Sequence, residues 1–294
     1  MATWFSQVPE EIRAPLLWAT LLPGGLALIS CAALLRLMKG GDGSPRPLVA
    51  ALGLLLPLLI GAGAFGVPQE KWQRFIYLLA AVVVLAMLAG SINRSWAFTL
   101  AAVLASGLAA AGWIWWELYL DEPFWIRMIP AAALLILVLG LEPLAQRERD
   151  GRAALFPAAL AIAAGAMAAI LVLSGNQFFA IYCASAAAVL AVGAVASAFS
   201  PSFTLSGGTL VPIALILTTM PHLAWLYVAG LPRAFIAAFI LAAGAPLMLW
   251  PIVLLTTKLP AWARFLLGLV AVAIAAGLAL AIAISNSDLG AYGY

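Results

Sequence analysis

Residues 265–285 read FLLGLVAVAIAAGLALAIAIS, an apolar run without a single charged side chain. A helix needs about 20 such residues to cross the hydrocarbon core of a bilayer, which is roughly 30 Å thick. A barrel strand needs only about 9–11 residues and alternates between apolar and polar positions, which this run does not do. The stretch therefore predicts a transmembrane helix.

The rest of the chain has the same character. Apolar residues make up 66% of its 294 residues and charged residues only 9%, whereas soluble domains average about 45–50% and about 25%. So few charged side chains cannot cover a surface that faces water. The composition predicts an all-α fold, a polytopic transmembrane helix bundle that forms a single membrane domain over 1–294, with short loops and no soluble domain.

Comparable apolar runs recur along the chain and predict about ten spans, within a range of eight to ten. The shortest run, 127–143, is the first that a model with fewer spans would omit. The predicted spans cover residues 14–37, 48–67, 75–92, 96–119, 127–143, 154–174, 178–199, 209–230, 234–256 and 265–285.

Basic residues in the predicted loops give an orientation. Alternate loops carry nine Lys and Arg residues on one side of the bundle and five on the other. Cytoplasmic loops carry the excess of Lys and Arg, so both termini are expected outside the cytoplasm. The Ala, Leu, Gly and Arg bias favours a bacterial inner (plasma) membrane. The basic residues lie singly, so the predicted partners are the lipid bilayer and, alternatively, other membrane subunits, and not nucleic acid.

The stretch TTMPHLAW at 218–225 holds the only histidine of the chain. Pro221 cannot donate a backbone hydrogen bond and is expected to kink the helix. Thr218, Thr219 and His222 then place polar groups beside a freed carbonyl, which is how discontinuous helices build sites within a membrane. These four residues are a candidate ligand or proton site; the alternative is a histidine bonded to a neighbouring helix, with a kink that only aids packing.

A second candidate is the aromatic stretch WIWWELYLDEPFW at 113–125. Helical rise places Glu117 near the far interface of its span, where Trp and Tyr commonly form a belt. The alternative to a belt is an outer vestibule in which Trp113, Trp116 and Tyr119 stack on a cationic or ring-bearing ligand beside Glu117.

The stretch GAPLMLWPIVLLTT at 244–257 predicts a second broken helix, with Pro246 and Pro251, that could flank one cavity or hinge with the first. Cys31 and Cys183 lie in apolar spans and are expected to act as small packing residues. One histidine cannot supply a metal or haem ligand set, and no catalytic or nucleotide-binding motif occurs in the sequence. No cofactor, metal site or enzymatic activity is predicted.

Residues 129–151, IPAAALLILVLGLEPLAQRERDG, resemble the helix-end Glu segment of small ten-helix permeases of the drug/metabolite type. The predicted outside N-terminus and the position of the segment depart from that pattern, so no residue roles follow from it. Three functions stay open: a permease-like transporter of a small neutral or amphipathic molecule, a non-catalytic subunit of a larger membrane complex, and a membrane enzyme that acts on lipids.

Overall fold

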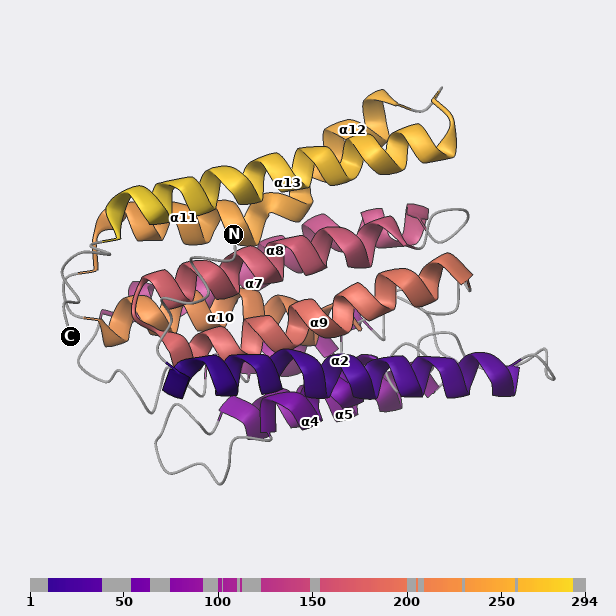
Figure 1. The fold of residues 1–294 in the computed structure, drawn as a ribbon, viewed down its shortest axis with the longest axis horizontal. Coiled ribbons are helices and arrows are strands. Elements are labelled where there is room, and N and C mark those ends of the chain that lie inside the picture. Colours follow the sequence, from indigo (N-terminus) through magenta and orange to yellow (C-terminus); the bar gives the residue numbers. More distant parts are fainter. Residues whose placement is uncertain are drawn as a thin grey trace.

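The protein folds into a bundle of helices that lie side by side (Figure 1). The computed structural model describes residues 10–38, 54–63, 75–91, 100–101, 103–109, 112, 123–148, 154–199, 205, 209–228, 231–256 and 259–287. The named elements are the α-helices α2 (Glu10–Met38), α4 (Leu56–Gly63), α5 (Phe75–Ser91), α7 (Phe124–Glu148), α8 (Leu155–Leu173), α9 (Gln177–Phe199), α10 (Val211–Tyr227), α11 (Arg233–Gly244), α12 (Leu249–Leu255) and α13 (Ala261–Asn286), and the 3-10 turn η4 (Ala245–Met248).

Within this described part every element is a helix, as the composition predicts. Six segments are long and apolar enough to cross a membrane: Leu17–Leu34, Met128–Ala145, Leu155–Leu173, Gln177–Phe199, Arg233–Leu255 and Trp262–Asn286. Phe75–Ala86 and Val211–Tyr227 are shorter apolar helices. The predicted runs 48–67 and 96–119 lie partly outside the described residues. By length and composition, the described part of the chain contains six candidate spanning helices, and the predicted count of eight to ten is not confirmed.

Helix α7 differs from its prediction. The run 127–143 is the shortest of the predicted spans and ends at Pro143. The helix instead extends over Phe124–Glu148 with Pro130 and Pro143 inside it, and Glu142 is buried, with 1% of its surface exposed. The predicted end of this span was wrong, because a membrane helix can continue through a proline when neighbouring groups compensate for the lost bond.

The centre of the bundle is the pair α8 and α9, which are joined by the three-residue turn Ser174–Asn176. Gly175 adopts a positive φ of 80° in this turn, a conformation that a glycine reaches without strain. Helix α2 packs on α9, and α11 and α13 pack on each other and on α8 (Figure 1). Helix α10 lies among α7, α9 and α5, so it is buried over most of its length.

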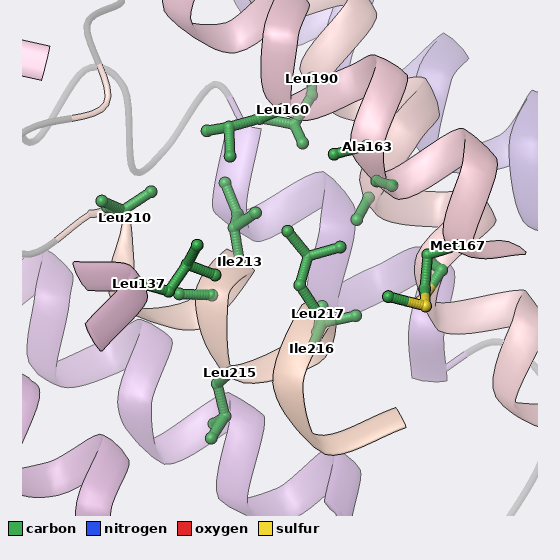
Figure 2. Packing of buried hydrophobic residues seen from close by; sticks show 14 of the residues in the cluster. Leu137, Leu160, Ala163, Met167, Leu190, Leu210, Ile213, Leu215, Ile216 and Leu217 are labelled. Atoms are coloured by element: carbon green, nitrogen blue, oxygen red, sulfur yellow. The ribbon is translucent and has the colours of Figure 1, made fainter. Parts of the chain in front are cut away.

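Apolar side chains from several helices fill the core around α10. Figure 2 shows Ile213 and Leu217 of α10 between Leu137 of α7 and Leu160 of α8. At the other side of the bundle, α2 and α9 approach closely. The Ser185 hydroxyl donates to the Ala19 carbonyl at 2.8 Å, and small residues at such contacts let the helices associate in lipid, where hydrophobicity supplies little drive.

Close packing at Gly193 gives a test of this arrangement. A Cβ added there would lie 2.9 Å from Cδ1 and 3.1 Å from Cδ2 of Leu54, whereas one added at Gly165 would meet only the Ala187 Cβ at 3.9 Å. We expect Gly193→Val to lower the free energy of unfolding by about 1–3 kcal/mol through overpacking, and Gly165→Ala to be tolerated. Thermal unfolding in one detergent measures the stability of both variants. Equal losses of stability in Gly193→Val and Gly165→Ala would contradict the packing.

Candidate functional site

Four elements enclose a pocket of about 400 Å³, which we call the lateral pocket. Its size falls in the range of small-molecule sites, roughly 300–1,000 Å³. Helices α7 and α10 form two walls, and α11 with η4 forms the third. The lining residues are Ile129, Ala133, Ile136, Leu137, Leu217, Thr218, Pro221, His222, Trp225, Ile236, Phe239, Ile240, Ala243, Gly244 and Leu247.

The α10 wall carries the candidate site that the sequence predicts. Thr218, Pro221 and His222 line the pocket, whereas Thr219 does not. The Thr219 side chain is fully buried, and within the described part of the chain its hydroxyl has no hydrogen-bond partner. The helical rotation per residue turns Thr219 away from the wall that its neighbour Thr218 forms. The structure thus brings three of the four predicted residues together; their role in binding stays a prediction.

Backbone and side-chain bonds define what these residues offer. The Thr218 hydroxyl donates to the Ala214 carbonyl at 2.8 Å, which leaves its oxygen able to accept a bond. Pro221 lies inside α10, which continues to Tyr227, and has no N–H to donate to the Leu217 carbonyl one turn before it. Polar atoms therefore line an otherwise apolar wall.

His222 is 7% exposed and meets the ring of Trp225 edge-on, with 5.4 Å between the ring centroids. Its imidazole has one nitrogen that can donate and one that can accept, and the indole of Trp225 adds a further donor. Together they form an aromatic and polar region on the pocket wall.

The α11 wall is interrupted, as residues 244–257 predict. Helix α11 ends at Gly244, the 3-10 turn η4 follows with Pro246 inside it, and α12 resumes at Leu249. Gly244 and Leu247 both line the lateral pocket. The cavity is thus flanked by α10, which stays a continuous helix through Pro221, and by the 3-10 turn that interrupts the α11 wall.

Gly140 of α7 closes one end of the pocket. A Cβ added at Gly140 would lie 2.8 Å from Cδ2 of Leu247, so the absence of a side chain lets Leu247 pack directly on α7. The indole N–H of Trp250 donates to the Gly140 carbonyl at 2.7 Å. This contact joins the α7 wall to the chain just beyond the 3-10 turn.

The pocket opens between α7 and α11. Ile136 and Ile240 line it and are also 65% and 67% exposed on the outside of the bundle. Ile136 lies half-way along the apolar window Met128–Ala145, and Ile240 lies about one third of the way along Arg233–Leu255. Apolar side chains that are exposed along such a window are suited to contact acyl chains rather than water.

The sequence did not reveal Glu142 as a buried carboxyl. Glu142 and His222 are the acidic and basic side chains that are buried among the described residues. No local signal distinguishes Glu142 from the charged residues that follow it, because its burial arises from packing between helices. It lies within the spanning window of α7, a position at which ionisable residues are commonly functional.

The other predictions about sites have mixed outcomes. Trp113, Trp116, Glu117 and Tyr119 lie outside the described residues, so the outer vestibule stays a prediction. Cys31 and Cys183 are buried free thiols. The described part of the chain contains no group of three or more His, Cys, Asp or Glu side chains that could hold a metal ion.

No protein-family model, curated protein or solved structure matches this chain. A functional interpretation therefore depends on the geometry of the lateral pocket.

The bond between Trp250 and Gly140 can be tested by removing only its donor. Trp250→Phe keeps a ring at this position and loses the N–H. We expect it to lower the free energy of unfolding by about 0.5–1.5 kcal/mol. Trp262→Phe is the control, because Trp262 is 67% exposed on α13. Thermal unfolding in detergent compares them; the same loss in both variants would show that the bond contributes nothing.

Proposed function

We infer that this membrane protein binds a small amphipathic molecule that it takes from the lipid phase, and that it acts as a permease-like carrier. The observation that carries the proposal is the lateral pocket, with its mouth between Ile136 and Ile240 at mid-depth and His222 on its wall. We further propose a bacterial inner membrane as the location, with both termini outside the cytoplasm, from the distribution of Lys and Arg in the loops.

The lining supports an amphipathic ligand. Most of its side chains are aliphatic, so an apolar body is favoured in the pocket by the hydrophobic effect. Polar groups come from α10 alone, through Thr218, His222 and Trp225. A few convergent polar groups in an apolar cavity are the usual way in which proteins orient a small ligand.

The irregular backbone beside the pocket supports transport. Non-helical backbone is tolerated at membrane depth where it is buried in protein or lines a cavity. The 3-10 turn Ala245–Met248 meets that condition, since Leu247 lines the pocket. Interrupted helices next to a central site are common in secondary transporters, where such breaks permit rocking movements.

A non-catalytic subunit of a larger complex is the second candidate. The outer helices α2 and α13 expose most of their spanning windows, of which 22% and 28% are buried within this chain. These faces could pack on other membrane subunits. The lipid-enzyme alternative depends on residues around Glu117, outside the described part of the chain, and gains no support here.

A matched pair of substitutions on α7 tests the proposal. Ala133 lines the pocket, and its neighbour Ala132 is exposed and does not. Ala133→Trp fills the cavity, whereas Ala132→Trp adds the same side chain to the outer surface. The measurement is native mass spectrometry of protein released directly from membranes, with small molecules then identified.

We expect wild type and Ala132→Trp to retain a bound amphipathic molecule. Ala133→Trp should retain about tenfold less of that molecule or lower, because the indole occupies the pocket. Equal retention in both variants would contradict the proposal. Co-release of other proteins in stoichiometric amounts, with no small molecule in any form, would favour the subunit function instead.

A further inference from the structure

We propose that the ligand of the lateral pocket is a neutral single-chain lipid, with its hydrogen-bonding head beside His222 and Trp225 and its chain end against Leu247. The proposal rests on the proposed function of this pocket and specifies which class of molecule it takes. Shape, the distribution of polar groups and the closed end all support it.

The pocket has two different ends. Helices α10 and α11 follow one another through a short connection and therefore run antiparallel. Trp225 near the end of α10 is accordingly level with Ile236 near the start of α11, and Leu217 is level with Gly244. The lining residues at the first end include the rings of His222, Trp225 and Phe239.

The second end of the pocket is aliphatic. Leu137 lines the pocket from α7 and Leu217 from α10, and Ala243 and Leu247 complete this end from α11 and η4. The ligand head and its apolar chain thus have separate environments. One offers aromatic N–H groups; in the other, aliphatic side chains predominate and the polar group is the Thr218 hydroxyl, which already donates to the Ala214 carbonyl.

The pocket is long and narrow. Its lining along α11 and η4 extends from Ile236 to Leu247, which at 1.5 Å per residue is about 16 Å. Its volume of about 400 Å³ along that length accommodates one extended hydrocarbon chain.

The head of the ligand is expected to be neutral. Among the described residues that line the pocket, none is Lys, Arg, Asp or Glu. A carboxylate or an ammonium group would be buried without an opposite charge, at a high desolvation cost. A hydroxyl or ester carbonyl can instead bond with the imidazole of His222 or the indole of Trp225 at a much smaller cost.

The closed end gives the pocket a maximum chain length. Leu247 packs on Gly140, and the bond from Trp250 to the Gly140 carbonyl holds the walls together there. Phe239 lies at the same level of the pocket as His222. The distance along α11 and η4 from Phe239 to Leu247 is about 12 Å at a rise of 1.5 Å per residue. Leu247 is therefore the residue that limits the chain, and its size should decide which chains bind best.

The test uses the full protein in phospholipid nanodiscs and a 1-alkanol with a diazirine at the end of its chain. Light crosslinks the bound probe, and unlabelled saturated 1-alkanols of increasing length compete with it. We expect the probe to label the region of Gly140 and Leu247, and competition to peak at one length and fall for longer chains. Alkanes of that length should compete about tenfold more weakly or worse, because they lack the hydrogen bond of the head group. The same is expected of alkanoates and alkylammonium ions, because they would bury a charge.

Substitution at Leu247 is the decisive comparison. Leu247→Ala should move the best competitor to a longer chain and Leu247→Phe to a shorter one. Leu241 is exposed on the outer side of α11 and does not line the pocket. Leu241→Ala should therefore leave the chain length of the best competitor unchanged. Competition that is independent of length, or the same in Leu247→Ala and Leu241→Ala, would overturn the proposal.

The two proposals can fail separately. If Ala133→Trp loses a native small molecule while no 1-alkanol competes, the ligand class is wrong and the pocket still binds a ligand. If Ala133→Trp and Ala132→Trp keep equal amounts of the native molecule, the proposed function itself is wrong.

Discussion

The structure depends on one constraint, that a backbone N–H or C=O in hydrocarbon must find its partner within the protein. An α-helix satisfies this requirement within a single segment, which explains why the apolar runs are helical wherever the structure describes them. The constraint also limits where a helix can be interrupted. Pro221 in α10, which leaves the Leu217 carbonyl without its helical donor, and the 3-10 turn Ala245–Met248 both lie along the lateral pocket. The departures from regular helix bonding are therefore placed where a ligand could contact them.

Association of the helices rests on a different kind of contact. Small residues allow α2 and α9 to approach closely enough for Ser185 to bond with a backbone carbonyl. Gly140 plays a comparable part between α7 and η4, since its missing side chain admits Leu247 and its carbonyl accepts the bond from Trp250. One glycine thus both fixes the end of the pocket and holds two of its walls together, while the middle of the same seam opens to lipid.

Much of the fold follows from the sequence because hydropathy acts locally. The apolar run 154–174 contains α8, and the run 178–199 matches α9 to within one residue. The sole histidine of the sequence marks α10 as a candidate site. The end of α7 could not be predicted in this way. Pro143 and the charges after it are typical of a loop, and only contacts from other helices explain why Glu142 is buried.

The pocket itself was beyond sequence reasoning for the same reason. Thr218 and Thr219 are adjacent and chemically identical, yet only Thr218 lines the cavity, because the rotation of α10 against its neighbours decides which side chain faces inward. The contributions of Ala133, Phe239 and Leu247 come from two other helical segments and depend on how these pack. Local patterns predict helices well, but the sites between them arise from tertiary contacts.

The central claim is that the mouth of the pocket faces acyl chains at mid-depth in the bilayer. A nitroxide spin label at Ile240→Cys, measured by power-saturation electron paramagnetic resonance in liposomes, tests it most directly. The account predicts frequent collisions with oxygen, which concentrates in the bilayer core, and few with a water-soluble nickel complex. Frequent collisions with the nickel complex would place the mouth in water and contradict the account.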